Sequence, residues 1–223
     1  MTLADGRVLV VGSASDGIDV VAGSSETAEV YDPASGRFGL TEPLPGIDWL
    51  ALAENGIRDL SAYRAERSGG GALVALDDGG ALLIGHHDST WHGISVQVTR
   101  SFRFDAGLAR WAETGQTYAW VKDYETGHQV ETAGVRNLEG AMVAPLSDGR
   151  ILVAGGGGRE GWDSTTMAEL YDPMTDTWAN LPPMPEARRD GSALVLADRS
   201  ILILGGSGND GLLTSAIRFV PGD

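Results

Sequence analysis

The chain has 223 residues, 42% of them hydrophobic, and a formal net charge of −15 at pH 7. This length and apolar content suffice for one domain with a packed core, while the acidic excess repels phosphate backbones and argues against a nucleic-acid partner. The sequence contains no cysteine, which excludes disulfides, thiolate metal sites and cysteine nucleophiles.

The beginning of the sequence shows neither the basic region nor the long apolar core of a secretion signal. No run of residues approaches the roughly 18 apolar residues of a membrane-spanning helix. We therefore expect an acidic, soluble protein without a membrane partner, which is cytoplasmic by default and secreted only if the N-terminus is truncated.

One motif appears four times: an apolar entry, a turn with aspartate, a short apolar run and then small residues. The copies are LADGRVLVVGS from Leu3, LDDGGALLIGH from Leu76, LSDGRILVAGG from Leu146 and LADRSILILGG from Leu196. Asp-Gly between two apolar runs predicts a hairpin with a two-residue type I′ turn, in which both central residues have positive φ. Arg199 takes the place of glycine in the fourth copy.

A second motif follows each turn at a similar distance. It pairs two aromatic residues seven positions apart, and the pairs are Tyr31 with Phe38, Phe104 with Trp111, and Tyr171 with Trp178. In the fourth copy Phe219 takes the tyrosine position. Because one register holds through four segments, we interpret the chain as an internal repeat.

Each repeat predicts four short antiparallel strands, here named a to d. The repeats cover residues 1–45, 70–115, 140–185 and 186–223, with insertions at 46–69 and 116–139. The first repeat lacks most of strand a and the fourth lacks strand d. Since a single four-stranded sheet cannot bury both of its faces, repeats of about 50 residues should pack radially as the blades of a propeller, in one domain over residues 1–223.

The two insertions carry weaker patterns. In residues 46–69, Leu50, Leu52, Ile57 and Leu60 predict a short helix that is broken or capped near Asn55. In residues 116–139, two segments that flank Glu125-Thr126-Gly127 predict an extra hairpin.

The chain resembles kelch repeats. The residues that carry the likeness are Gly155-Gly156, Glu169 to Pro173 and Trp178, with matches at Gly205-Gly206, Tyr31 to Pro33 and Phe38. The resemblance implies an all-β, kelch-type β-propeller with about four blades of four-stranded antiparallel sheet and incomplete first and last blades. Kelch propellers usually have more blades than four, so we expect either a fragment of a longer propeller or an assembly that completes itself through the incomplete blades.

The topology places a–b and c–d turns on one face of the disc, and b–c loops and d-to-a connections on the other. Every long loop should therefore emerge on the second face, where binding sites usually lie. The candidate ligand-binding residues on that face are Trp49, His86, His87, Trp91, His92, Trp120, Tyr124, His128, Trp162, Arg136 and Arg188. Trp111 and Trp178 are instead expected to pack between blades.

Several chemical interpretations of these residues compete. His86 with His92 could hold a metal ion, but surface or hydrogen-bonded histidines explain the pattern more simply, and we expect neither a metal site nor a cofactor. The central propeller of galactose oxidase is also kelch-like, but its cofactor needs a cysteine that this chain lacks. Arg136 and Arg188 could bind a carboxylate in the channel, although pairing with local acidic residues is the simpler expectation.

We therefore expect a non-catalytic binding module that presents its Trp-, Tyr- and His-rich loop face to a protein or carbohydrate partner. A sugar-active enzyme domain (a hydrolase, epimerase or oxidase) is the alternative, and it requires His86, His92, Arg136 and Arg188 to converge with Asp88 or Asp190. A truncated propeller without independent function is the third hypothesis.

Overall fold

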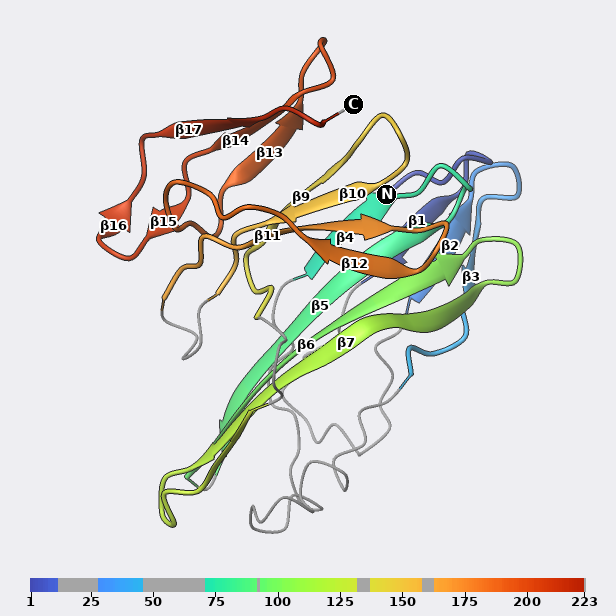
Figure 1. Ribbon diagram of the computed structural model, residues 1–223. Helices are drawn as coiled ribbons and strands as arrows, with labels where there is room; N and C mark the ends of the chain where they lie inside the picture. Colours follow the sequence, from blue (N-terminus) through green and yellow to red (C-terminus); the bar gives the residue numbers. More distant parts are fainter. Residues whose placement is uncertain (12–27, 46–70, 92, 132–136, 158–162, 223) are drawn as a thin grey trace.

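The computed structural model describes residues 1–11, 28–45, 71–91, 93–131, 137–157 and 163–222. Within these ranges all regular structure is β-strand. The strands form four antiparallel sheets of three to five strands, here called blades 1 to 4, and one small two-stranded sheet (Figure 1). None of the described residues forms a helix long and apolar enough to cross a membrane. The prediction of an all-β fold is confirmed, whereas the predicted helix near Leu50 lies outside the described residues.

Each blade corresponds to one sequence repeat. Blade 1 contains β1 (Val8–Val11), β2 (Ala28–Asp32) and β3 (Arg37–Leu40). Blade 2 contains β4 (Gly71–Ala75), β5 (Ala81–Trp91), β6 (Ile94–Asp105), β7 (Arg110–Asp123) and β8 (Gln129–Glu131). Blade 3 contains β9 (Met142–Pro145), β10 (Ile151–Ala154), β11 (Ala168–Asp172) and β12 (Thr177–Asn180). Blade 4 contains β13 (Ser192–Val195), β14 (Ile201–Leu204) and β17 (Ala216–Phe219), with the small hairpin of β15 (Ser207–Gly208) and β16 (Gly211–Leu212) between β14 and β17 in the chain.

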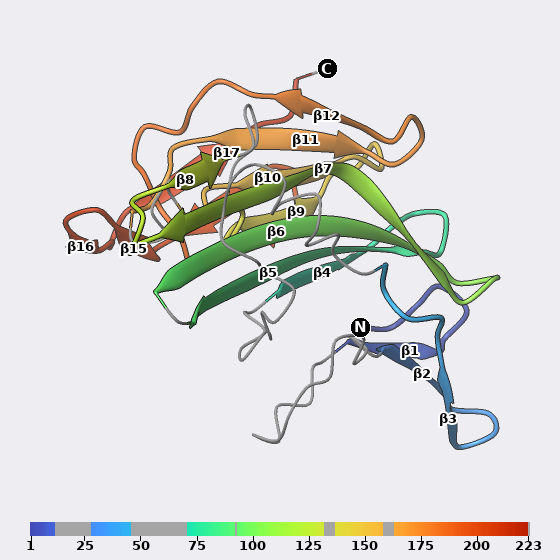
Figure 2. The same ribbon diagram turned by 90° about the horizontal axis from the view of Figure 1, so that it is seen from below.

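Among the described residues, the main sheets of blades 1 to 4 contain three, five, four and three strands. Blades 1 and 4 therefore have the three strands that their repeats predict, and blade 2 exceeds the expected four. The blades follow one another in an arc, with blade 1 at one end and blade 4 at the other (Figures 1 and 2).

The a–b turns share one hydrogen-bond pattern in all four blades. In blade 3, Gly149 N donates to Leu146 O over 3.1 Å and Leu146 N donates to Arg150 O over 2.7 Å. The same two bonds recur in the other blades at the turns that begin at Leu3, Leu76 and Leu196. The aspartate side chain adds a third bond, because Asp148 Oδ1 accepts from Arg150 N over 3.1 Å. An aspartate that bonds the backbone two residues ahead stabilises a turn locally, which explains its presence in every copy.

The predicted type I′ geometry is wrong. The bonds enclose three loop residues rather than two, and only the residue after the aspartate has positive φ, 85° at Gly149 and 67° at Arg199. This is the three-residue hairpin with a single left-handed position, which fits the strand twist equally well. Arg199 adopts the conformation that glycine takes in the other copies, so the fourth turn keeps its shape despite the substitution.

Apolar clusters join each blade to the next. We call the side of a blade that packs on the following blade its forward face, and the side that packs on the preceding blade its backward face. The forward face of blade 1 includes Leu9 and Val30, and it packs on Leu83, Phe104 and Trp111 from the backward face of blade 2. The next two junctions repeat this arrangement, between blades 2 and 3 and between blades 3 and 4. The core of the molecule therefore lies between the blades.

The aromatic pairs lie on the backward faces. Tyr171 pairs with Trp178 across β11 and β12 with ring centroids 5.0 Å apart, and Phe104 pairs with Trp111 at 4.8 Å. Tyr171 is fully buried against the forward face of blade 2. The prediction that Trp111 and Trp178 pack between blades is confirmed.

Blade 2 extends beyond the other blades as a long arm. Its strands β5, β6 and β7 run on past the common blade length and project away from the rest of the array (Figure 1). The b–c loop predicted at residues 86–95 is therefore wrong, since only residues 92 and 93 separate the two strands. The missed signal is the alternation Ile94-Ser95-Val96-Gln97-Val98, in which the three apolar residues are buried.

The extra hairpin predicted in residues 116–139 is confirmed in β7 and β8. Val121 pairs with Val130 and Lys122 with Gln129. The first strand of this hairpin is not separate, however, because β7 runs without a break from the strand d position of blade 2 to the tip of the arm.

Glycine at the end of β10 is required by a close approach between blades. Gly155 has a φ of 70°, and a Cβ on it would overlap the carbonyl oxygen of Arg188. Gly36 has a nearly identical φ of 68° but open space around it. We predict that Gly36→Ala costs about 1–2 kcal/mol of unfolding free energy from the left-handed backbone. Gly155→Ala should cost about 2 kcal/mol more, because the Arg188 carbonyl must also move.

Urea titrations of the two variants measure this difference directly. Equal losses in Gly36→Ala and Gly155→Ala would show that the junction between blades 3 and 4 tolerates a methyl group there.

Candidate functional site

The tip of the arm is a tight turn held by one aspartate. Asp123 is buried, and its Oδ1 accepts hydrogen bonds from Glu125 N over 2.9 Å and Thr126 N over 3.2 Å. Gly127 N and Asp123 O close the turn at 2.8 Å. These bonds fix the backbone, and they leave the side chains around the turn directed outward.

Two of the predicted ligand-binding residues lie at this tip. Tyr124 is 59% exposed, and Lys122 Nζ lies 5.0 Å from the centre of its ring, which is a cation–π contact. Tyr124 N donates to Gly93 O over 2.8 Å, so the β7–β8 turn adjoins the β5–β6 turn. His128 is exposed, and its backbone carbonyl accepts from Asp123 N over 2.9 Å. Tyr124 and His128 are therefore brought together on the arm, as the sequence places them.

The other predicted residues of the arm have different positions. His86, His87 and Trp91 lie on β5, where they pair with Thr99, Val98 and Ile94.

Trp120 was predicted to lie among the ligand-binding residues of the loop face, and the structure places it elsewhere. It lies on β7 opposite Gln97 and is buried rather than displayed at the surface. Trp120 Nε1 and Gln97 Oε1 are both buried polar atoms without a hydrogen-bond partner among the described residues. Sequence reasoning assigned Trp120 to a surface loop because the continuous strand β7 was not recognised.

Arg188 pairs with a nearby acidic residue, as the simpler of its two interpretations predicted. Its side chain is fully buried, and it donates from Nη1 to Gly205 O over 2.9 Å and from Nη2 to Glu186 Oε2 over 3.0 Å and Ser215 Oγ over 2.9 Å. These bonds tie the connection between blades 3 and 4 to the end of β14. Nη1 and Nη2 thus serve the structure, while Arg188 Nε is buried without a hydrogen-bond partner among the described residues.

The remaining predicted residues, Trp49, His92, Trp162 and Arg136, lie outside the described residues. Among the described residues, no group of three or more histidine, aspartate or glutamate side chains is placed to hold a metal ion.

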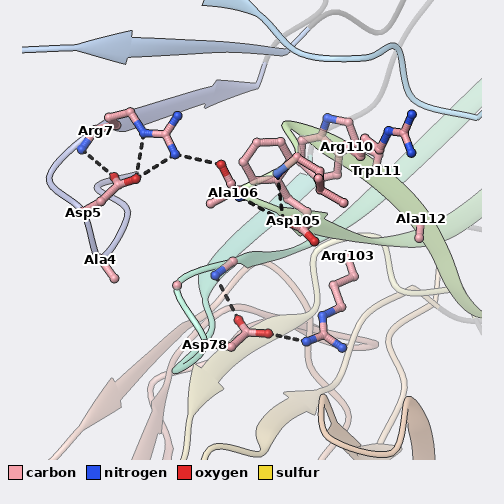
Figure 3. Close-up of a pocket in the computed structure, with 15 residues that line it drawn as sticks. Ala4, Asp5, Arg7, Asp78, Arg103, Asp105, Ala106, Arg110, Trp111 and Ala112 are labelled. Carbon is pink, nitrogen blue, oxygen red and sulfur yellow. Dashed lines mark hydrogen bonds and ion pairs between the residues drawn. The ribbon is translucent and has the colours of Figure 1, made fainter.

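The structure also contains a groove that the sequence did not predict. It has a volume of about 790 Å³ and lies between blades 1 and 2, on the face of the a–b and c–d turns (Figure 3). None of the predicted site residues lines it. Its polar side chains are Asp5, Arg7, Asp78, Arg103, Asp105 and Arg110, and Trp111 and Leu108 contribute apolar surface.

The charges of the groove are arranged in pairs. Arg7 Nε donates to Asp5 Oδ2 over 2.7 Å, and Arg7 Nη2 donates to Ala106 O of blade 2 over 2.7 Å (Figure 3). Arg103 contacts Asp78 in the same way, and its Nη1 donates to Pro173 O of blade 3 over 2.7 Å. The arginines thus link neighbouring blades at the rim of the disc. In the sequence Arg7 directly follows the blade 1 turn, whereas Arg103 lies on β6, and the partner of each arginine across the junction is set only by packing.

These contacts lower the pKa of two acidic groups of the groove, Asp5 and Asp78. The hydrogen bond from the Arg7 side chain lowers the pKa of Asp5. Partial burial acts to raise the pKa of Asp78, but the bonds from Gly80 N and Arg103 outweigh it and leave the pKa below its usual value. Both carboxylates therefore stay ionised in acidic solutions that would protonate a free aspartate.

The lowered pKa of Asp78 predicts a dependence of stability on pH. A carboxylate with a folded pKa below its unfolded pKa stabilises the fold above the unfolded value and loses this contribution as pH falls through the folded value. We predict that Asp78→Asn lowers the unfolding free energy at pH 7 and weakens its decline between about pH 5 and pH 2. Arg103→Gln should also flatten the decline, because it removes the cation that holds Asp78 ionised.

Urea unfolding of each variant across this pH range provides the measurement. If the unfolding free energy of Asp78→Asn depended on pH as in the wild type, the assignment of this dependence to Asp78 would be wrong.

Comparisons with known proteins agree with the blade architecture. The kelch motif matches residues 142–185, which correspond to blade 3 and its connection to blade 4. The kelch-like protein terF of Aspergillus terreus is 39% identical over 110 residues, which cover 45% of this chain and 23% of that protein. An F-box/kelch-repeat protein of Arabidopsis thaliana is 31% identical over 119 residues, or 52% of this chain and 20% of that protein.

Kelch-like protein 35 of Mus musculus is 34% identical over 62 residues, which cover 28% of this chain and 11% of that protein. The matched segments thus span less than a quarter of each relative. The matches agree with the aspartate turns, the aromatic pairs and the stacked antiparallel sheets, and the chain is a kelch-repeat protein with the blades of a β-propeller.

Proposed function

We propose that this chain is a non-catalytic protein-interaction module and that the tip of the blade 2 arm is its principal contact surface. The observation that carries the proposal is the exposed Tyr124 ring with Lys122 beside it, at the end of a three-stranded extension. Tyrosine supplies a large contact area with little loss of side-chain freedom and is enriched among the residues that dominate interfaces.

The arm suits this role because its base is rigid and its tip is displayed. Strands β5, β6 and β7 pair continuously from blade 2 outward, apart from one irregularity in register between Thr99 and Ser101. The buried Asp123 holds the turn, so the Tyr124 backbone is ordered before a partner arrives. A contact surface that is ordered in advance loses less entropy on binding.

The kelch relatives support a protein partner, because the Arabidopsis protein is named for kelch repeats together with an F-box. A sugar ring also stacks on an exposed tyrosine, so a carbohydrate is the alternative ligand. The buried position of Trp120 removes one of the aromatic rings on which that alternative depends.

We predict that Tyr124→Ala lowers the affinity of the chain for its protein partner by about 30-fold, as expected for the loss of a dominant aromatic contact. Lys122→Glu should weaken binding too, since it removes the cation beside the ring. Met174→Ala is the matched control, because Met174 is exposed on the c–d turn of blade 3, away from the arm.

The measurement is affinity purification with each immobilised variant, followed by titration of the retained proteins. Retention that is equal in the wild type and in both arm variants would contradict the proposal. Binding to a glycan array that is lost in Tyr124→Ala, without a retained protein, would replace the protein partner by a carbohydrate.

A further inference from the structure

The groove between blades 1 and 2 lies where blade 2 departs from the repeat. Directly after the a–b turn, blade 1 has Arg7 and blade 3 has Arg150, whereas blade 2 has Gly80. The three positions are equivalent, since each precedes the strand b residue that pairs with the first aromatic residue of its blade. A side chain is excluded in blade 2, because a Cβ on Gly80 would overlap the carbonyl oxygen of Phe104.

Where the arginine is present, it serves two aspartates of its own blade. Arg150 Nε donates to Asp148 Oδ2 of the a–b turn over 2.8 Å. This bond raises the pKa of Arg150, and the charge of Asp172 on the c–d turn raises it further. The same relation holds in blade 1 for Arg7, Asp5 and Asp32. One cation therefore neutralises an aspartate from each of the two turns.

Blade 2 leaves one of these two aspartates without a cation. Arg103 bonds Asp78 of the a–b turn and reaches Pro173 O of blade 3. Asp105, which the strand register places at the position of Asp172, has no such partner. Its Oδ1 accepts from the backbone of Gly107 over 2.9 Å and of Leu108 over 3.0 Å. Its Oδ2 makes no hydrogen bond or ion pair with a described residue, and the side chain is exposed.

The other charges that line the groove are paired. Arg7 pairs with Asp5, Arg103 with Asp78, and Arg110 Nε with Glu42 Oε1 over 2.9 Å. Among the described residues, Asp105 is therefore the charged group of the groove that lacks a counter-ion. This favours a cationic ligand over an anionic one, and the net charge of −15 attracts cations at longer range. A metal ion would need several oxygen ligands, which one carboxylate does not supply.

The shape of the groove also reflects what blade 2 lacks. Where the c–d turn of blade 3 has Pro173 and Met174, blade 2 has the smaller Ala106 and Gly107. The small side chains and the missing arginine leave the volume of about 790 Å³, which lies in the usual range of ligand sites. Figure 3 shows Asp105 between the Asp5–Arg7 pair and the Asp78–Arg103 pair.

We propose that the groove binds an arginine side chain of a partner protein, in the place that Arg7 and Arg150 fill in the neighbouring blades. The guanidinium donates to Asp105 Oδ2, and its remaining N–H groups can reach backbone carbonyls, as those of Arg7 and Arg103 do. The aliphatic stem lies against Leu108, which lines the groove and is 64% exposed.

This site is separate from the tip of the arm. It lies on the face of the a–b and c–d turns, at the internal junction where Leu9 and Phe104 share one apolar cluster. None of its lining residues belongs to the β7–β8 turn. Binding at the groove and binding through Tyr124 can therefore be tested independently in the same chain.

The test uses a capped alanine peptide with one central arginine as the probe. In NMR titrations of the whole chain, this peptide should shift the backbone amide signals of Gly79 and Gly80, which line the groove, and leave that of Gly149 in place. A dissociation constant of about 1 mM is expected for one ion pair at an open site. A peptide with citrulline, the neutral analogue of arginine, should bind at least tenfold more weakly, because it cannot form a charge-assisted hydrogen bond.

Two variants with matched controls locate the contact. Asp105→Asn should weaken binding of the arginine peptide by about tenfold, because the charge is lost while the turn keeps its acceptor. Asp172→Asn is its control, since it makes the same change at the same position of blade 3.

Gly107→Met tests the space, because it adds the side chain that Met174 provides in blade 3 and should likewise weaken binding by about tenfold. Ala34→Met is its control, since Ala34 holds the same turn position in blade 1 and does not line the groove. Thermal unfolding of all four variants verifies that they fold.

Three results would overturn the proposal. The first is an arginine peptide that leaves Gly79 and Gly80 unchanged at concentrations up to about 10 mM. The second is equal affinity for the arginine and citrulline peptides, and the third is equal affinity of Asp105→Asn and Asp172→Asn for the arginine peptide. None of these results bears on Tyr124, so the proposed function of the arm stands or falls separately.

Discussion

The structure depends on the fact that each of its sheets is apolar on both faces. A short antiparallel sheet with one apolar face can lie on a single partner, but a sheet with two needs a neighbour on each side. The alternation of strand residues produces this property directly, as in β10, where Leu152 faces blade 4 and Val153 faces blade 2. Stacking of blades follows from it, and so does the exposure of apolar residues at the two ends of the array.

Polar contacts at the rim add specificity to this apolar stacking. The turn aspartates bond their own backbone, and arginines beside them reach the carbonyls of the following blade at Ala106 and Pro173. Blade 2 has Gly80 where blade 1 has Arg7, yet Arg103 from strand β6 makes the equivalent contact. The junction therefore keeps its polar contact although the residue that provides it changes. Such a contact favours one alignment of the blades, which apolar packing alone specifies less strictly.

The arm shows how one blade can gain a separate surface without disturbing the array. The base of β5, β6 and β7 keeps the blade register, with Ala81, Phe104 and Trp111 in the positions of their counterparts in blade 3. Beyond it, the strands are stabilised by buried residues such as Val96 and Val121. Sequence reasoning found the β7–β8 hairpin and the exposed Tyr124 and His128. It misplaced Trp120, because whether a ring on a strand is covered depends on the neighbours of that strand in space.

The sequence by itself determined the blade register, the positions of the turn aspartates and the aromatic pairs, because these features arise from local bonds and from the two-residue period of a strand. Only the tertiary structure decided the three-residue geometry of the turns, the length of the arm, the burial of Arg188 and the groove between blades 1 and 2. Those features depend on contacts between residues that are distant in the chain, such as Arg7 with Ala106 and Arg103 with Pro173.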